Sequence, residues 1–259
     1  MAHTIYDNFI LANKLADMLT TQVDLNAYMT VDTSLTQEPG MKIKVHTYSA
    51  TSGVEELTMG QGNSKDIEVS FTSNEYEVKT FQGRFVYYDE QEMTDPMVVD
   101  TGLAGVSADL INQFTTLAIA EFDKASLTQT GTAWNFDVVV DAIAKMNLEN
   151  EEGLFLLISP ADKAAFRKAL REDLSYSEGF VRTGYIGTVA GVPVIVSKAV
   201  PAGKGYLATK DAVSLFIKKD TEVEQERDAD HRKNSVFGRK VAVVALTDAT
   251  KAVKITIGG

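Results

Sequence analysis

The stretch GTVAGVPVIVS, Gly187 to Ser197, joins a glycine-rich turn to a run of β-branched residues. With Gly184 before it, the glycines read G-x-x-G-x-x-x-G, which matches neither the dinucleotide-binding pattern G-x-G-x-x-G nor the phosphate-loop pattern G-x-x-x-x-G-K-S/T. Both of those loops lead into a helix, whereas a strand pattern follows here. The glycines therefore predict a β-turn that enters a strand, in which Pro193 marks an edge or a bend.

Helix and strand signals alternate upstream of this stretch. LFLLI at 154–158 is a short apolar run that suits a buried central strand. Ser159 and Pro160 then provide a cap and a first helical residue for the segment PADKAAFRKALRED. Asn135 similarly caps an earlier amphipathic segment, FDVVVDAIAKMN. This alternation predicts a compact α/β unit in the middle of the chain.

A long helix is predicted before that unit. Asp95 suits the N-cap and Pro96 suits the first helical position, and apolar residues at helical spacing follow them. We expect one helix over about 96–126, which at ~1.5 Å per residue would be about 45 Å long. Gly102 and Gly105 are expected to loosen its first turns.

Two strands with an unusually long connection are predicted before the helix. MKIKVHTY at 41–48 alternates apolar and polar residues, which is the period of a half-buried strand. The alternation resumes in IEVSF at 67–71 and continues as strand to Tyr88. The connection at 49–66 has few large apolar residues, and a connection of this length is uncommon in a compact domain unless it has a function or is disordered.

The two ends of the chain carry further patterns. Residues 4–20 have apolar side chains at helical spacing and predict an amphipathic helix that could act as a docking arm. The segment KKDTEVEQERDADHRK at 218–233 is expected to be a charged connection. Apolar patterning then predicts a hairpin-like pair of strands, one at 240–246 and one at 253–257.

The composition narrows the class of protein. Of the 259 residues, 44% are apolar and 24% are charged, which is typical of folded soluble domains. The absence of cysteine excludes disulfides and thiolate metal sites, and the formal charge of −11 opposes sequence-independent binding to nucleic acid. No apolar run reaches the ~18 residues of a membrane span, and the N-terminal residues lack the basic region of a signal peptide. We therefore expect an intracellular soluble protein without a membrane partner.

Few residues are candidates for catalysis. The histidines are His3, His46 and His231, and His231 lies near two carboxylates, Asp228 and Asp230, with which it could share a metal ion. A solvated charged loop explains this cluster better, and neither G-x-S-x-G nor H-E-x-x-H occurs in the chain. We predict no enzyme activity, no cofactor and no metal, and keep as an alternative an α/β enzyme with a site near His231.

The order of these pieces resembles a known family. A docking arm, two strands with a protruding loop, a long helix, an α/β unit and returning strands follow one another as in the major capsid proteins of tailed phages with the Hong Kong 97 type of fold. The resemblance covers nearly the whole chain and is carried most specifically by GTVAGVPVIVS at 187–197 and FGRKVAVVALTDATKAVKI at 237–255. It implies an α+β fold with an N-terminal arm, an extended β-hairpin loop, a peripheral domain with a long spine helix, and an α/β axial domain.

The resemblance also implies a division of the chain. The tips of the axial domain would meet around the axes of capsomers, and the extended loop would lie over a neighbouring subunit. The implied parts are an N-terminal arm at 1–30, an extended loop at 48–84, a peripheral domain at 31–47, 85–129 and 226–259 with its spine helix at about 96–126, and an axial domain at 130–225.

The function that the resemblance implies is structural. The chain would be the major capsid protein of a phage or prophage, forming the hexamers and pentamers of an icosahedral shell that encloses double-stranded DNA without sequence-specific binding. A portal is an implied partner, the chain would use a separate scaffolding protein or none, and assembly would take place in the bacterial host cytoplasm. The residues expected at contacts between subunits are Phe9, Leu15, Glu55, Glu56, Met59, Lys79, Arg84 and Tyr185.

A second hypothesis within the same fold remains open. A bacterial nanocompartment of the encapsulin type is also a shell of one kind of subunit, but it holds enzyme cargo. A groove for a cargo peptide would favour this alternative.

Overall fold

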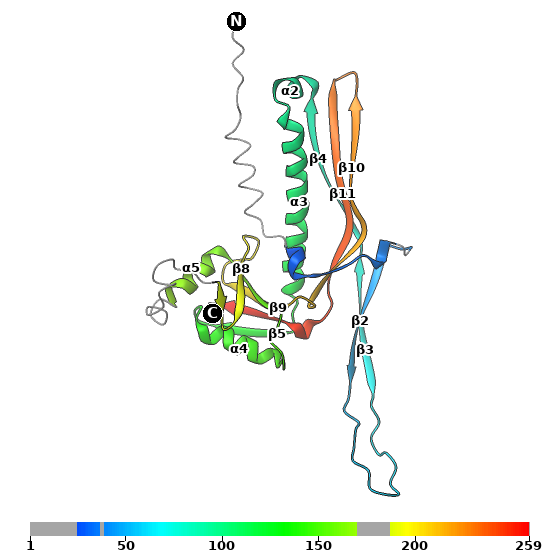
Figure 1. Cartoon of the computed structure of the whole chain (residues 1–259), viewed down its shortest axis with the longest axis vertical. Helices are drawn as coiled ribbons and strands as arrows, with labels where there is room; N and C mark the ends of the chain where they lie inside the picture. The colour runs from blue at the N-terminus through cyan, green and yellow to red at the C-terminus, as the bar shows by residue number, and fades with distance from the viewer. Residues whose placement is uncertain (1–24, 37–38, 170–186, 259) are drawn as a thin grey trace.

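The structure is a computed structural model that describes residues 25–36, 39–169 and 187–258. Figure 1 shows an elongated molecule in which one long helix stands beside a tall layer of strands. A two-stranded hairpin extends from that layer in the opposite direction, and a compact unit lies to one side. The helix predicted at 4–20 lies outside the described residues.

The long helix, α3, spans Met97–Phe122 and follows a short helix, α2, at Asp89–Thr94. The predicted long helix is therefore confirmed, although it is shorter at both ends than 96–126. The helix starts one residue later than predicted, because Pro96 rather than Asp95 occupies the N-cap position. Asp95 still contacts this end of the helix, since its carboxylate accepts a hydrogen bond from the backbone N–H of Met97 at 3.0 Å.

α3 covers one face of a four-stranded sheet (Figure 1). In spatial order the strands are β1 (Thr30–Asp32), β10 (Val213–Asp228), β11 (Lys233–Leu246) and β4 (Lys79–Tyr88). β1 runs parallel to β10, and the other neighbours are antiparallel. Two 3-10 helices, η1 (Leu25–Tyr28) and η2 (Ser34–Thr36), flank β1.

The glycines in the first turns of α3 do not loosen the helix, which is continuous through them. At Gly102 a Cβ atom would lie 2.4 Å from the ring of Phe85, so the missing side chain lets the helix approach β4. On the sheet, Val106 occupies the space that Gly83 and Gly238 leave open. Close packing of helix and sheet therefore explains Gly83, Gly102 and Gly238, although nothing packs against Gly105, and the expectation of a loosened helix is wrong.

The charged segment 218–233 is a second correction, because it forms most of β10 and its turn into β11. Its alternating carboxylates lie on the sheet face opposite α3, where Arg239 binds Glu222 at 2.9 Å and Glu224 at 2.5 Å. A strand that is exposed to solvent can carry a charge at every second position, and its composition is then the same as that of a loop. For this reason the composition predicted a loop where the structure has a strand.

The compact unit is built on a six-stranded mixed sheet. In spatial order its strands are β5 (Leu127–Gly131), β12 (Ala252–Ile257), β9 (Lys204–Thr209), β6 (Leu154–Ile158), β8 (Val192–Val196) and β7 (Thr188–Val189). Two helices, α4 (Phe136–Met146) and α5 (Pro160–Ala169), belong to this unit. The predicted α/β unit is confirmed, and β6 is buried along its whole length as expected.

Both predicted helix caps in this unit are confirmed. The side chain of Asn135 accepts a hydrogen bond from the N–H of Val138 at 2.9 Å, and the hydroxyl of Ser159 accepts one from the N–H of Asp162 at 3.1 Å. The buried carboxylate of Asp162 in turn accepts the N–H of Gly203. This bond ties the start of α5 to the turn that leads into β9.

The glycine turn before Pro193 joins β7 to β8 at the edge of the six-stranded sheet. Ala190 at φ 50° and Gly191 at φ 81° both have the left-handed conformation that a tight hairpin turn requires. The predicted turn into a strand is therefore confirmed, but Pro193 does not mark an edge strand, because β8 lies between β6 and the short edge strand β7. Gly184 lies outside the described residues.

The two C-terminal strands are confirmed as strands, but they do not pair with each other. β11 belongs to the four-stranded sheet and β12 to the six-stranded sheet. A 3-10 helix, η3 at Ala249–Lys251, connects them, so the chain passes here from one sheet to the other. An apolar pattern identifies a strand without identifying its neighbour.

One hydrophobic core joins the two sheets. Phe122 at the end of α3 packs against Phe155 of β6 and Tyr206 of β9, with ring centroids 6.1 and 6.2 Å away. Phe114 of α3 packs edge-on against Phe81 of β4 at 5.0 Å. Of the helices that the structure describes, none combines the length and the apolar character needed to cross a membrane.

The hairpin that leaves this body consists of β2 (Lys42–Ala50) and β3 (Val69–Glu77), which are antiparallel. The prediction of two strands with a protruding loop is confirmed. β3 continues into β4 through the buried Val78, whose N–H donates to the carbonyl of Met41 at 2.8 Å.

Candidate subunit-contact surfaces

The projecting hairpin has two chemically different faces. The pairing of β2 with β3 places Tyr48 opposite Phe71 and His46 opposite Ser73, so the three rings share one face. The ring centroids lie 5.7 to 6.2 Å apart. The opposite face carries hydroxyl side chains, namely Thr47, Ser49, Ser70 and Thr72.

The hydroxyl face is the one that turns toward the body of the chain. On this face Val45 is buried against Phe216 and Ala245, close to where the hairpin leaves the body. One step further out, the hydroxyl of Thr47 donates to the carbonyl of Thr247 at 3.5 Å. The hairpin is therefore anchored on its hydroxyl side.

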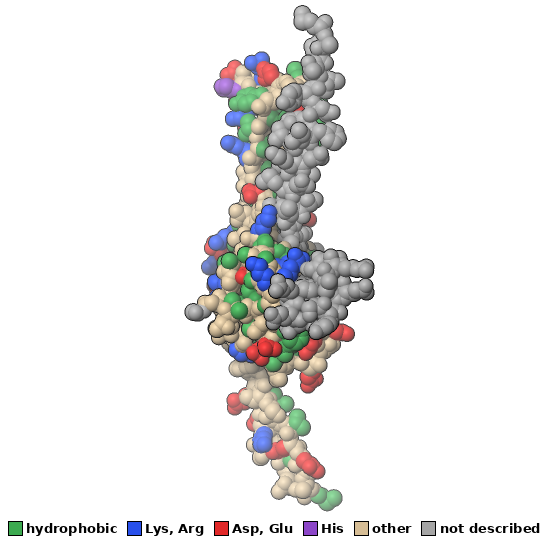
Figure 2. All heavy atoms as spheres, turned by 90° about the vertical axis from the view of Figure 1, so that its left-hand side faces the viewer, with side chains coloured by type: hydrophobic (Ala, Val, Ile, Leu, Met, Phe, Trp, Pro, Cys, Tyr) green, Lys and Arg blue, Asp and Glu red, His purple; other side chains and the backbone are tan. Residues whose placement is uncertain are grey.

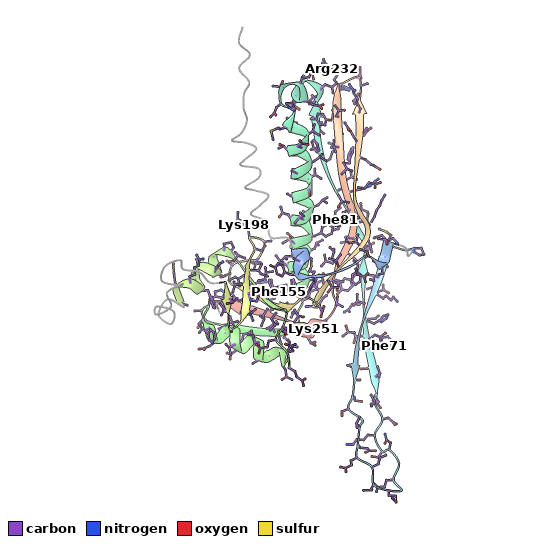
Figure 3. The ribbon with its side chains drawn as sticks, in the orientation of Figure 1. Phe71, Phe81, Phe155, Lys198, Arg232 and Lys251 are labelled. Atoms are coloured by element: carbon purple, nitrogen blue, oxygen red, sulfur yellow. The ribbon has the colours of Figure 1, made fainter. Side chains whose placement is uncertain are left out.

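The aromatic face turns away from the body. The side chains of Tyr48 and Phe71 are 67% and 65% exposed, and Val69 further along the same face is 64% exposed. Figure 3 shows Phe71 on the projecting hairpin, far from Phe81 and Phe155 inside the body. Sheets of isolated proteins normally place their apolar face inward, so this hairpin has the reverse arrangement.

The loop at 51–68 exposes further apolar side chains, which Figure 2 shows on the surface down to the tip of the hairpin. Met59 is fully exposed. Glu55 holds the loop together, because its carboxylate accepts the N–H and the hydroxyl of Ser64 and its pKa is thereby lowered. Glu56 is exposed. Of these three predicted contact residues, Glu56 and Met59 thus face solvent, while Glu55 shapes the loop.

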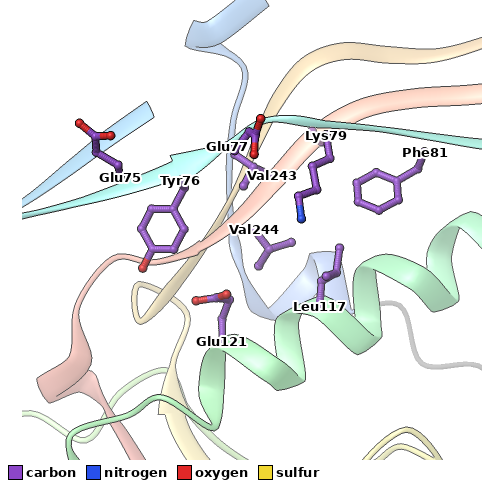
Figure 4. Close-up of a pocket in the computed structure, with 10 residues that line it drawn as sticks. Glu75, Tyr76, Glu77, Lys79, Phe81, Leu117, Glu121, Val243 and Val244 are labelled. Carbon is purple, nitrogen blue, oxygen red and sulfur yellow. The ribbon is translucent and has the colours of Figure 1, made fainter. Parts of the chain in front are cut away.

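Lys79 lines an open cavity of about 220 Å³ at the base of the hairpin, between β3, β4, β11 and α3 (Figure 4). Glu121 of α3 forms part of its wall. One carboxylate oxygen of Glu121 binds Lys124 at 2.5 Å, and the other is buried without a hydrogen-bond partner among the described residues. The ammonium group of Lys124 also lies 5.9 Å from the centre of the Tyr76 ring.

Arg84 lies on the opposite face of β4 from Lys79, because strand residues of odd and even number alternate. Its guanidinium lies 6.0 Å from the ring centre of Phe237 on the neighbouring β11, and its side chain is exposed. The two predicted contact residues on β4 therefore belong to different surfaces. The remaining candidates, Phe9, Leu15 and Tyr185, lie outside the described residues.

A charged cluster that the sequence analysis missed joins α3 to the six-stranded sheet. The carboxylate of Asp123 accepts hydrogen bonds from Lys254 at 2.9 Å and from Lys204 and Tyr206 at 3.0 Å. Burial alone would raise the pKa of Asp123, but these hydrogen bonds outweigh it and lower the pKa to about 2. Burial and the neighbouring Asp123 raise the pKa of Tyr206. No local motif marks this cluster, because its members come together only in the folded chain.

The residues of the enzyme alternative form the turn between β10 and β11. The carboxylate of Asp228 accepts the N–H groups of Asp230 and His231 at 3.1 and 3.2 Å, and lies 2.8 Å from Nδ1 of His231. These contacts close the turn. Within the described ranges, no group of three or more such side chains is placed to hold a metal ion.

The exposed aromatic face was also missed, because the alternation in IEVSF at 67–71 predicts a strand without telling which way its apolar side chains face. The apolar side chains of Ile43 and Val45 on β2 face the body of the chain, as the alternation predicts. Phe71 on β3 instead lies on the outer face, with Lys44 and His46. The signal was present in the sequence, but reading it requires the pairing register of the two strands.

Comparison with known proteins gives a consistent result. A family model described as phage capsid protein matches residues 72–255. A curated relative, the major capsid protein of Staphylococcus phage phiMR11, is 25% identical over 265 residues and covers 97% of this chain and 94% of its own length.

Solved structures are similar in fold at lower identity. A structure from Mycobacterium phage Che8 has a TM-score of 0.70 at 16% identity, covering 90% of each chain. The capsid of cyanophage P-SCSP1u has a TM-score of 0.71 at 14% identity, covering 89% of this chain and 86% of its own. A virus-like particle from Pyrococcus furiosus has a TM-score of 0.64 at 12% identity, covering 94% and 96%.

Proposed function

The chain belongs to the family of phage capsid proteins, and on that premise we propose that its copies form the hexamers and pentamers of an icosahedral shell around double-stranded DNA. Two expectations from the sequence are confirmed: the α+β fold of the Hong Kong 97 type and the role of major capsid protein that forms the shell of a phage. The arrangement of the shell and its contents are the proposal.

The observation that carries the proposal is the projecting hairpin. A two-stranded hairpin has at most marginal stability by itself, yet this one presents aromatic and aliphatic side chains to solvent over most of its length. Obligate interfaces commonly bury ~2,000 to 5,000 Å², and reaching such an area requires surfaces that extend beyond a compact body. A hairpin of this kind is useful to a subunit that has neighbours.

We assign roles to the parts of the chain from this arrangement. The hairpin and its loop, residues 42–77, would lie over a neighbouring subunit; we end this part before β4 rather than at 84, because β4 pairs with β11 in the sheet of the body. The docking arm would end before Leu25 rather than at 30, because Leu25 and Met29 are buried in the chain's own core. The unit with α4 and α5 would form the axial domain, meeting its copies around capsomer axes. Because β10 pairs with β11 in the sheet that α3 covers, we end the axial domain at about residue 212 rather than at 225.

The candidate contact residues divide among these roles. Glu56 and Met59 at the exposed loop would touch a neighbour directly, and Glu55 would preserve the shape of the loop. Arg84 would offer a cation beside Phe237 on the outer face of the four-stranded sheet. Phe9 and Leu15 would belong to the arm.

The proposal extends to the partners and the place of assembly. The formal charge of −11 favours a wall that encloses DNA without binding it tightly. A separate scaffolding protein and a portal would take part in assembly, which would occur in the cytoplasm of the bacterial host. In this role the chain needs no cofactor and carries out no catalysis.

The test is the state of the purified protein. Light scattering after size exclusion, with negative-stain images of the fast-eluting fraction, is expected to show closed particles or rings of subunits. Subunits that remain 28.2 kDa monomers at all concentrations, with and without the phage's other head proteins, would contradict the proposal.

The contents of the particles separate a virion shell from a nanocompartment. Particles purified from phage-infected cells are expected to contain nuclease-protected double-stranded DNA. Particles that contain only a cargo enzyme would support the encapsulin-type alternative instead.

A further inference from the structure

We propose that the aromatic face of the β2–β3 hairpin, made by His46, Tyr48, Val69 and Phe71, is the face that docks on a second copy of this chain. The hydroxyl face then stays in contact with water. This inference rests on the proposed function, because it takes neighbouring copies as given. It adds which of the two faces makes the contact and which residues carry it.

The first argument is the direction of the two faces. The hydroxyl face turns toward the chain's own body, where Val45 and the hydroxyl of Thr47 anchor it. Beyond Thr47 that face satisfies its own polar groups, as the 2.7 Å hydrogen bond between Ser49 and Ser70 shows. It therefore gains little from a partner.

The second argument is the cost of leaving the aromatic face in water. Tyr48 and Phe71 each remain about two-thirds exposed although they are in contact with each other and with the ring of His46. Aromatic side chains bury roughly 150–250 Å² each and dominate interface energies. An exposed cluster of this kind marks a site of interaction with another protein.

The third argument is the charge of the loop beyond the rings, since on the aromatic face itself Lys44 and Glu75 pair with each other at 2.9 Å. The loop at 51–68 carries four carboxylates, Glu55, Glu56, Asp66 and Glu68, and one cation, Lys65. Arg84 on the outer sheet face contacts a ring, and no carboxylate of the described residues forms an ion pair with it. Arg84 of a second copy would therefore bring a cation to the β2–β3 hairpin and its loop, which carry aromatic rings and carboxylates.

The absence of cysteine makes the test direct, because a single introduced thiol has no competitor. Ser73→Cys places a thiol on the aromatic face beside His46, and Thr72→Cys places one on the hydroxyl face at the neighbouring residue. Alkylation rates are measured for each variant in isolated subunits and in assembled shells made from this chain alone.

The expected result is selective protection. The thiol at 73 should react at least about tenfold more slowly in shells than in subunits, because the centre of an interface excludes water, while the thiol at 72 should keep its rate. Equal rates at both positions, or protection at 72 alone, would overturn the assignment of the face. Protection at 73 that requires an added accessory protein would overturn the assignment of the partner.

A second pair of variants tests the energetic role. Phe71→Ser is expected to raise the concentration needed for assembly roughly tenfold or more, as loss of a central aromatic does, whereas Thr72→Ala should leave it unchanged. Both subunits should keep the unfolding midpoint of the parent chain. Wild-type protein that never assembles would contradict the proposed function itself, whereas shells that form equally well from both variants would overturn only the choice of face.

Discussion

The two hairpins of this chain make an instructive comparison. β10 and β11 form a long hairpin in which α3 covers one face of β11, and β2 and β3 form a shorter one with no layer on its aromatic face. At the apex of the first, Asp89 binds both Arg227 and Asn234. On our proposal, the first hairpin is packed within the subunit, whereas the second is covered by a neighbour.

The difference teaches how local patterns should be interpreted in proteins that assemble. Both hairpins carry apolar residues on one face, but only at the first do Gly238 of β11 and Gly83 of the neighbouring β4 make room for a helix. An exposed apolar face without such a covering element is the kind of surface that marks a site of interaction with another protein. Substitutions in the two hairpins should therefore affect different measurements, either the stability of the subunit or its assembly.

The largest expected effect is from Phe114→Ala in the covered region. Phe114 is 5% exposed and packs against Phe81, so its truncation should destabilise the subunit by about 3–5 kcal/mol. The measurement is denaturant unfolding of the isolated subunit. The matched variant in the uncovered hairpin, Phe71→Ala, should change subunit stability by less than about 0.5 kcal/mol, because its ring is already in water. A comparable loss of stability in both variants would contradict the comparison.

The next effect concerns the glycines that let α3 approach the sheet. Gly102→Ala should destabilise the subunit by about 1–3 kcal/mol, because its Cβ would lie 2.4 Å from the ring of Phe85. A Cβ atom at Gly105 would meet no other atom within 4 Å. Gly105→Ala should therefore stabilise the subunit by about 0.5–1 kcal/mol, because alanine has the better helix propensity. Thermal unfolding of the pair measures the contrast, and two variants that shift in the same direction would disprove this account of α3.

A smaller effect should come from the charge cluster that ties α3 to the six-stranded sheet. Asp123→Asn should cost about 1 kcal/mol at neutral pH, a value reduced because the carboxylate is partly exposed. Because folding lowers the pKa of Asp123 from 3.8 to about 2, its stabilisation is complete above pH 4 and is lost as the pH falls through 2. Midpoints of the parent and the variant should therefore converge near pH 2.

The control for that prediction lies on the uncovered hairpin. Lys44 and Glu75 form an ion pair at 2.9 Å in which both side chains are about half exposed. Glu75→Gln should leave the unfolding midpoint of the subunit unchanged, since exposed pairs contribute little. Asp123→Asn without a change in midpoint at any pH would show that the two pairs are equivalent.

Local chemistry explains how much of this could be predicted from the sequence. Elements with a local signature were predicted, such as the caps at Asn135 and Ser159, the turn at Gly191 and the long helix. Features that depend on pairing were missed, because the direction of Phe71 depends on its register with Tyr48 and the partner of β12 depends on the path after Lys251. Of the predicted contact residues, Glu55, Glu56 and Met59 lie in the loop at 51–68, and their contact with a neighbour stays a prediction. The pattern could not distinguish Glu55, which bonds within the loop, from Glu56.

The smallest expected effect is at the tip of the covered hairpin, where the enzyme alternative places its site. The backbone N–H groups of Asp230 and His231, not the imidazole alone, hold the carboxylate of Asp228, so the turn should survive His231→Ala. We expect the unfolding midpoint to change by less than about 2 °C and the shells to form at the parent concentration. A catalytic role would predict the loss of an activity with assembly unchanged, whereas a contact role for the tip would appear as failed assembly. Either result would show that the β10–β11 hairpin, like the β2–β3 hairpin, acts on something outside its own subunit.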